Sequence, residues 1–303
     1  MRTVSAIRLQ PVAGAGGAAA CQVVDEDVLT IDVDGVGLYT LMWTAAEGAA
    51  LAAGFVAGEG VLGDVAVPER LALAVGFAYT EGIIAGLADI VSMGVCAERP
   101  DVVRMSLAAP ETVRVRRRNV VLSSSCGACG GREALENSMG DLPPVSDSLR
   151  LAAADLAQLM TGMQCSQRLY RTTGGAHAAA VFSGTRGIVA VAEDLGRHNA
   201  LDKVIGQCLL RGIALGGCGV VLSSRLSFEM IAKAARAGIE LVAAVSAPTS
   251  LAIDMAERLG ITLCGFVRGD SATVYTHPQR IRECAGAAAS GPGPLPGSFT
   301  TKD

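Results

Sequence analysis

The sequence predicts an α/β fold in which helices cover both faces of a β-sheet. From residue 151 onward, short β-like runs alternate with helix-like segments, the pattern of such a sheet. Half of the 303 residues are hydrophobic and only 4% are aromatic, so the core is expected to consist of Ala, Val, Leu and Ile. The high Ala and Gly content, with 37 glycines, favours close packing of helices on strands.

The first elements are expected to be a loose segment and a β-hairpin. Residues 1–22 are Ala/Gly-rich, lack the shape of a signal peptide and are expected to form a flexible leader. Apolar and polar residues alternate along residues 28–33. Asp34 and Gly35 then supply a tight turn, and residues 36–43 form the second, returning arm. This pattern predicts a β-hairpin.

Two related segments follow the hairpin. Residues 51–62 and 73–84 share the same apolar pattern with a glycine near the end, and we interpret them as two similar amphipathic helices. Residues 102–107, 112–115 and 119–122 are short apolar runs that predict strands.

The remaining elements alternate regularly. A helix is predicted at 131–138, and residues 142–147 break the pattern as a linker or a surface loop. Helices are then predicted at 151–165, 199–210, 227–237 and 249–259, and strands at 179–182, 187–191, 219–223, 239–245, 261–267 and 272–275. We expect four segments: a flexible leader (1–22), an N-terminal part with the hairpin and the loop that carries Cys126 and Cys129 (23–145), an α/β part (146–283) and a disordered tail (284–303).

Composition argues against several classes of protein. A formal net charge of −4 argues against general nucleic-acid binding, which needs a basic surface. No apolar stretch approaches the ~20 uninterrupted residues of a membrane span. The nine cysteines are widely spaced apart from one pair, which is typical of reduced thiols in the cytoplasm. Cys208, Cys218 and Cys264 lie in apolar runs and are expected to be buried.

Cys126 and Cys129 form the one paired cysteine motif, flanked by serines and glycines directly after the β-like run at 119–122. Small neighbours leave both sulfurs uncrowded, and hydroxyls and amides can donate hydrogen bonds to a thiolate. Such a pair can attack a sulfur atom, hold a persulfide, form a disulfide or supply half of a metal site.

A zinc site at this pair is not expected. Tetrahedral zinc needs four ligands, and the chain has no second paired motif and only three histidines. In zinc deaminases a proline precedes the Cys-x-x-Cys element, whereas here Ser125 precedes Cys126. The sequence therefore favours persulfide or thiol–disulfide chemistry without a structural metal.

Two polar segments are candidates for ligand binding. His177 follows a glycine pair before an apolar run, where it can exchange a proton near neutral pH or serve only as a hydrogen-bonded core residue. Residues 193–203 place charges before and within a helix start, which favours anions. Arg197, His198 and Lys203 are suited to hold a phosphate there; the alternative is a well-capped, solvated helix start.

Three consecutive strand ends carry small, hydroxylated or charged residues. Such ends form the ligand crevice of α/β sheets. No G-x-G-x-x-G or P-loop motif accompanies them, so neither a standard dinucleotide fold nor a P-loop is supported. The residues concerned are Ser223, Ser224, Arg225, Ser246, Ala247, Phe266, Val267, Arg268, Gly269, Asp270 and Ser271.

Taken together, these segments resemble the FdhD family of formate dehydrogenase accessory sulfurtransferases, also called sulfur carrier proteins. The resemblance covers most of residues 25–280 in order; the copy at 51–62 looks like an insertion, and the proline-rich tail lies outside it. The matching segments are LAVGFAYTEGII (73–84), SSCGACG (124–130), TGGAHAA (173–179), EDLGRHNALDKVIG (193–206), SSRLSFEM (223–230), AVSAPTSLA (244–252) and residues 265–276.

The resemblance implies a function and a fold. Such proteins take sulfur from a cysteine desulfurase as a persulfide and pass it to Mo-bis(molybdopterin guanine dinucleotide), which formate dehydrogenase requires. The resemblance implies that Cys126 carries the persulfide with Cys129 assisting, and that residues 266–271 contact the cofactor. Ser223, Arg225, Ser246, His177 and His198 are further candidates. The implied fold is a cytidine-deaminase-like α/β/α sandwich with an N-terminal β-rich subdomain, usually as a homodimer.

Two other classes of function stay open at this point. A thiol–disulfide oxidoreductase would use Cys126 and Cys129 as a dithiol, although such proteins place an aromatic residue before the pair, where this chain has serines. A non-catalytic chaperone would only bind and deliver the cofactor. Incubation with a desulfurase and cysteine distinguishes them, because a carrier gains sulfur, an oxidoreductase loses two hydrogens, and a chaperone is unchanged.

Overall fold

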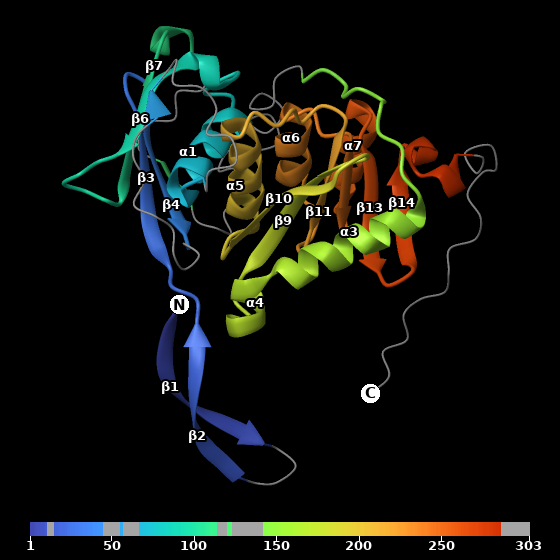
Figure 1. Cartoon of the computed structure of the whole chain (residues 1–303), viewed down its shortest axis with the longest axis horizontal. Coiled ribbons are helices and arrows are strands. Elements are labelled where there is room, and N and C mark those ends of the chain that lie inside the picture. Colours follow the sequence, from blue (N-terminus) through green and yellow to red (C-terminus); the bar gives the residue numbers. More distant parts are fainter. Residues whose placement is uncertain (11–14, 45–54, 57–66, 114–119, 123–141, 286–303) are drawn as a thin grey trace.

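The computed structural model describes residues 1–10, 15–44, 55–56, 67–113, 120–122 and 142–285, and all statements below refer to these (Figure 1). Their strands form a two-stranded ribbon and two six-stranded sheets. The N-terminal sheet has the order β5-β6-β7-β3-β4-β8, and the C-terminal sheet the order β10-β9-β11-β12-β13-β14. The mixed α/β class predicted from the sequence is confirmed.

The predicted hairpin forms the middle of the N-terminal sheet. β3 (Asp27–Val33) and β4 (Gly37–Trp43) pair antiparallel, and Gly35 takes a φ of +72° in the turn. β7 (Val102–Leu107) lies parallel to β3, as expected of a strand there, and β8 (Val120–Leu122) lies parallel to β4.

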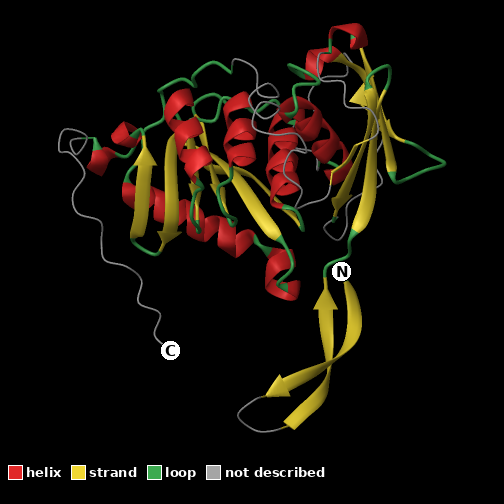
Figure 2. Ribbon diagram, turned by 180° about the vertical axis from the view of Figure 1, so that it is seen from behind, coloured by secondary structure: helices red, strands yellow, loops and turns green. Residues whose placement is uncertain are grey.

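The expected loose leader at 1–22 is instead an antiparallel ribbon of β1 (Arg2–Gln10) and β2 (Ala15–Val23). The ribbon extends away from the rest of the protein in both views (Figures 1 and 2). Its second strand, AGGAAACQV, has almost no β-branched or aromatic residues, so propensity gave no sign of it. The strand is instead held in place by its backbone pairing with β1 along nine residue pairs.

Two other local predictions differ from the structure, and one strand was not predicted. Residues 55–56 lie in a strand, β5 (Phe55–Val56), beside the unpredicted β6 (Ile90–Val95), whereas a helix was predicted at 51–62. Pro110–Thr112 forms a 3₁₀ turn where a strand at 112–115 was predicted, since proline fixes φ and lacks an N–H for a ladder. The rest of 51–62 and the predicted helix at 131–138 lie outside the described residues.

The second predicted helix of that pair, 73–84, is α1 (Glu69–Thr80), which packs against α5 (Arg197–Leu210). Each helix carries one glycine at the crossing. A Cβ added at Gly76 would lie 1.8 Å from the carbonyl oxygen of Asp202, and one at Gly206 would lie 1.9 Å from that of Ala72. The two glycines therefore allow the helix backbones to approach each other, which joins the two halves of the protein.

The C-terminal sheet confirms the predicted alternation. Three parallel strands lie between antiparallel neighbours. The short helix α4 (Arg168–Thr173) was not predicted. The strands are β9 (His177–Ser183), β10 (Gly187–Asp194), β11 (Cys218–Leu222), β12 (Leu241–Ala244), β13 (Thr262–Arg268) and β14 (Ser271–Thr276).

Helices cover both faces of this sheet. α5, α6 (Phe228–Arg236) and α7 (Ser250–Leu259) bury one face, and α3 (Ala153–Ser166) lies across the other (Figures 1 and 2). Each face has its own core cluster, made mainly of Ala, Val, Leu and Ile as the composition predicts. The result is the α/β/α arrangement expected from the sequence.

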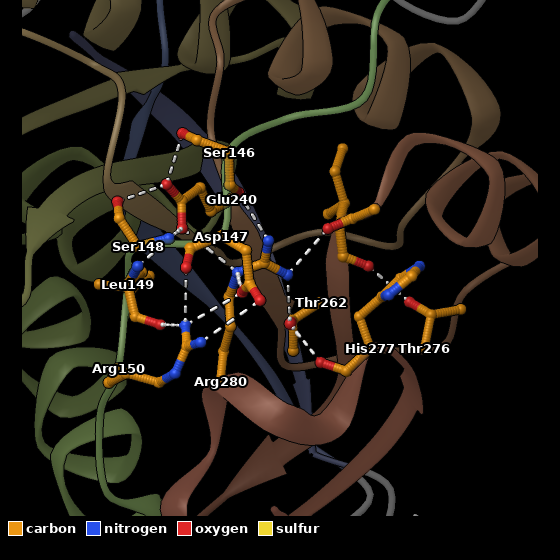
Figure 3. Close-up of polar contacts among 12 residues, drawn as sticks. Ser146, Asp147, Ser148, Leu149, Arg150, Glu240, Thr262, Thr276, His277 and Arg280 are labelled. Atoms are coloured by element: carbon orange, nitrogen blue, oxygen red, sulfur yellow. Dashed lines mark hydrogen bonds and ion pairs between the residues drawn. The ribbon is translucent and has the colours of Figure 1, made fainter.

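A buried ion pair holds the segment before α3 against the amino-terminal edge of the parallel strands (Figure 3). The fully buried Glu240 accepts hydrogen bonds of 2.7 Å from Ser146, Ser148 and the amide of Leu149. Its carboxylate lies 3.3 Å from Nε of Arg280. The segment at 142–147, which the sequence left open as a linker or a loop, is thereby fixed to the sheet. The boundary between the two expected parts at 145/146 stays a prediction.

Candidate functional site

The sheet topology brings the predicted site residues to one edge. β11, β12 and β13 are parallel and therefore end at the same edge. β9 runs antiparallel to β11, so its first residue, His177, lies at that edge too. β10 ends there as well, with Asp194 opposite His177, and α5 begins three residues later. This is the crevice position at which open α/β sheets bind ligands.

Hydrogen bonds between the strand ends shape the crevice. The Ser223 hydroxyl accepts a hydrogen bond of 2.8 Å from the amide of Ala178, and Ser246 offers its carbonyl to the amide of Phe266 at 3.2 Å. The guanidinium of Arg268 donates to the carbonyl oxygen of Val245 at 3.1 Å. The amide of Val245 also donates to the carbonyl oxygen of Leu222 at 3.2 Å, so hydrogen bonds connect the ends of β11, β12 and β13.

The turn at 266–271 has an unusual backbone. Phe266 adopts a φ of +53°, rare for a residue with a bulky side chain, and its side chain is partly exposed. Gly269 has a φ of +52°, and no atom lies within 4 Å of a Cβ built there. Asp270 and Ser271 are exposed. Val267 is buried at 1% exposure, so its side chain belongs to the core and only its backbone can contribute to a site.

A pocket of about 590 Å³ opens beside this edge, between α3, α4 and the first residue of β9. This volume is within the range of small-molecule sites. Ser223 and Val245 connect the pocket to the crevice, and α4 contributes Tyr170 and Arg171. Sequence reasoning missed these two residues because α4 is too short to give a helical period. The lining consists of Gln164, Gln167, Tyr170, Arg171, Gly174, Gly175, Ala176, His177, Ser223 and Val245.

His177 lies in a positively charged environment. Burial and then the positive charges of Arg197, His198 and Arg225 lower the pKa of His177, against a smaller opposing effect of Asp194. The His177 imidazole is therefore neutral near pH 7. The sequence left its role open between a functional and a core residue, and the structure places it half-buried on the pocket wall.

His198 pairs with Glu229 across the starts of two helices. Its Nε2 lies 3.4 Å from the Glu229 carboxylate, which also accepts a 3.0 Å hydrogen bond from Ser227. The contact with His198 lowers the pKa of Glu229 to about 2. The pair holds the first turn of α5 against the first turn of α6, next to the strand end that carries Arg225.

Lys203, expected to hold a phosphate with Arg197 and His198, does not face the crevice. Its Nζ is fully buried, 2.8 Å from Asp194 and 3.2 Å from Glu69, and it also donates to the carbonyl oxygen of Thr44. The prediction was wrong because α5 lies between the sheet and α1, so a side chain on either of these faces, such as Lys203, is buried. Lys203 joins β4, α1 and β10.

The reactive pair predicted from the sequence, Cys126 and Cys129, lies outside the described residues. The three cysteines expected to be buried are confirmed as core residues. Burial raises the pKa of Cys208 and of Cys264 to about 12 and also raises the pKa of Cys218, so these thiols are not nucleophiles near neutral pH.

Across the described ranges, no three His, Cys, Asp or Glu side chains gather closely enough to hold a metal ion. Because both paired cysteines lie outside these ranges, the absence of zinc stays a prediction. Zinc deaminases also carry a His-x-Glu or Cys-x-Glu element before their paired cysteines. This chain contains such an element, Cys96-Ala97-Glu98, so the small number of available ligands is the main argument against a zinc site. None of the helices that the structure describes is long and apolar enough to cross a bilayer.

The fold is that of an α/β protein whose parallel strands end at one polar edge, beside a pocket. The FdhD/NarQ family model matches residues 65–282, and the chain belongs to this family. The "Sulfur carrier protein FdhD" of Bordetella bronchiseptica is 47% identical over 265 residues, 86% of this chain and 87% of that protein. Its counterpart in Streptomyces avermitilis is 38% identical over 273 residues, 88% and 90% of the two chains.

The fold is also that of a solved structure. A putative formate dehydrogenase accessory protein from Desulfotalea psychrophila superposes with a TM-score of 0.68 at 22% identity. The superposition covers 92% of this chain and 98% of that one. At this level of identity the match establishes the shared fold.

Proposed function

We propose that this protein is a sulfurtransferase that accepts sulfur from a cysteine desulfurase as a persulfide on Cys126 and delivers it to the molybdenum cofactor. The cofactor is Mo-bis(molybdopterin guanine dinucleotide), bound as a substrate, and formate dehydrogenase is the enzyme that depends on it. The protein acts in the cytoplasm as a homodimer. The observation that carries this proposal is the 47% identity to a sulfur carrier protein over most of both chains.

Sulfur enters and leaves in two balanced steps. The Cys126 thiolate attacks the outer sulfur of the desulfurase persulfide, so that one S–S bond forms as another breaks and the desulfurase thiol is released. The Cys129 thiol then attacks Cys126 at its inner sulfur, which forms a disulfide and releases hydrosulfide and a proton. The two electrons that reduce the transferred sulfur come from the thiols, so a thiol reductant in solution must reduce the disulfide before the next cycle. The same external thiol can release the sulfur from Cys126 when Cys129 is replaced.

Side chains at the strand ends support a guanine dinucleotide as the ligand. Phe266 is partly exposed and can flank a purine, and Gly269 leaves open space above its backbone. Arg268 and Arg225 can form paired hydrogen bonds with phosphate oxygens. Ser223 and Ser246 lie at the adjoining strand ends.

Complementation tests the proposal. In cells that lack the native carrier, wild-type protein should restore formate dehydrogenase activity, Cys126→Ala should not, and Cys129→Ala should restore part of it. Cys165→Ala is the matched control, because Cys165 is exposed on α3 and is not part of the paired motif. Full activity with Cys126→Ala would show that this thiol does not carry the sulfur.

A further inference from the structure

Basic side chains from four parts of the fold lie in or near one wall of the pocket. Arg171 comes from α4, His177 begins β9, Arg197 and His198 begin α5, and Arg225 follows β11. Arg171 and His177 line the pocket, and the charges of the other three act on the His177 ring. This wall therefore carries a concentration of positive charge at a cavity large enough for a nucleotide.

The carboxylates near this wall already have partners within the fold. Asp194 binds Lys203 and Asn199, and Glu229 binds His198. The carboxylate of Glu193 accepts hydrogen bonds from the first amides of α4.

Of the cations, Arg197 has a buried Nε without a hydrogen-bond partner among the described residues. A buried donor without a partner among these residues is available to an acceptor on a ligand. The positive charge of the wall and this unsatisfied donor point to an anionic ligand.

We propose that His177, Arg197 and Arg225 bind the diphosphate of the guanine nucleotide, and that His177 takes up a proton when the diphosphate binds. This inference rests on the proposed function and adds which ligand group is held and how pH controls it. Without ligand, the His177 ring is neutral because it is half-buried among Arg197, His198 and Arg225, with Asp194 as the opposing charge. A diphosphate between these groups reverses the local charge and stabilises the imidazolium.

Proton uptake makes binding pH-dependent. Affinity for the diphosphate should rise as the pH falls, by up to about tenfold per pH unit between the pKa of His177 in the free protein and its higher pKa in the complex. A suitable probe is diguanosine 5′,5′-diphosphate, since a phosphate diester lacks the second ionisation, at about pH 6, of a terminal phosphate. Any linked proton then belongs to the protein.

Calorimetric titration of the full chain at about pH 6 and pH 8, in two buffers of different ionisation enthalpy, measures affinity and protons taken up. Wild-type protein should bind more tightly at the lower pH with proton uptake. His177→Gln should lose both effects, and Arg197→Met should weaken binding at both pH values. His277→Gln is the matched control, because His277 contacts Glu257 at the opposite edge of the sheet.

Proton NMR of the three imidazole rings gives a second readout on wild-type protein, with His177 assigned by its absence in the variant. The His177 signal should shift to the imidazolium position when the probe binds. Persistent proton uptake in His177→Gln, or an unshifted His177 signal, would overturn the inference while nucleotide binding still supported the proposed function. Failure of wild-type protein to bind the probe or GDP at either pH would overturn both.

Discussion

The Nζ of Lys203 lies 2.8 Å from a carboxylate oxygen of Asp194, and both side chains are fully buried. The second carboxylate oxygen of Asp194 accepts hydrogen bonds from the amide of Gly196 and from Asn199. Asn199 in turn donates to the carbonyl oxygen of Met42 near the end of β4. The polar segment at residues 193–203 therefore has two roles. Its inner residues join the two sheets, while Arg197 and His198 are left at the crevice.

Replacing Lys203 by Met should destabilise the protein strongly. The substitution leaves Asp194 charged and buried, which costs about 3–5 kcal/mol. Denaturant unfolding should show this loss, and Lys203→Met with Asp194→Asn should recover part of it. Arg99→Met is the control, since the ion pair of Arg99 with Asp101 is exposed and contributes little to stability. Equal, small losses in both single variants would contradict the structural role of Lys203.

Glu240 should make stability depend on acidic pH. Burial alone would raise its pKa, but hydrogen bonds from Leu149, Ser148 and Ser146 lower the pKa of Glu240 to about 2. The unfolded chain, with an ordinary glutamate pKa, binds the proton more readily, so the stabilisation is complete above about pH 4.5 and is lost as the pH falls towards 2. Glu240→Gln should therefore lower the unfolding free energy at pH 7 and flatten its acid dependence.

The matched control for this variant is Glu98→Gln, because Glu98 is exposed in the turn between β6 and β7. Chemical denaturation between pH 2.5 and 7 measures both variants. A parallel pH dependence in wild-type protein and Glu240→Gln would assign the acid sensitivity to other carboxylates.

Gly76→Ala should destabilise the protein although alanine favours helices. The gain in helix propensity is about 1 kcal/mol, whereas the new methyl group would lie 1.8 Å from the Asp202 carbonyl oxygen and force α1 and α5 apart. Overpacking of this kind costs up to about 3 kcal/mol, so a net loss of about 2 kcal/mol is expected. Gly86→Ala is the control: no atom lies within 4 Å of a Cβ built at Gly86, so its Tm should be nearly unchanged. Thermal unfolding compares the two, and an unchanged Tm for Gly76→Ala would contradict the close contact.

The nucleotide site can be tested with GDP, which resembles half of each cofactor arm. Combining Arg268→Ala with Gly269→Leu removes a cation and places a bulky side chain at a φ of +52°. Loss of a charged hydrogen bond is worth about 1.5–3 kcal/mol, so calorimetry should show affinity weakened by at least about tenfold. Arg150→Ala, at the opposite edge of the sheet near Glu240, should bind normally. Unchanged binding by the double variant would place the nucleotide elsewhere.

The sequence predicted the C-terminal sheet well because β9 to β14 and their helices alternate with clear boundaries. It also placed His177, His198 and the three strand ends at one edge of the sheet, since parallel strands share an edge. The ribbon of β1 and β2 could not be predicted, because an Ala/Gly strand is ordered by pairing and has no period of its own.

The role of Lys203 was equally hidden from the sequence. A helix start with several charges has the same composition whether its lysine faces a ligand or a buried aspartate. Only the packing of α1 against α5 shows that Lys203 is internal. Tyr170 and Arg171 were missed for another reason, because the six residues of α4 make fewer than two helical turns.

Intact-protein mass spectrometry tests the central claim most directly. Purified protein is incubated with a cysteine desulfurase and cysteine, and each product is mapped by peptide analysis without reductant. We expect one added sulfur on the peptide that contains Cys126, retained in Cys129→Ala and absent in Cys126→Ala. A mass unchanged, or lowered by two hydrogens without any prior gain of sulfur, would contradict a persulfide carrier.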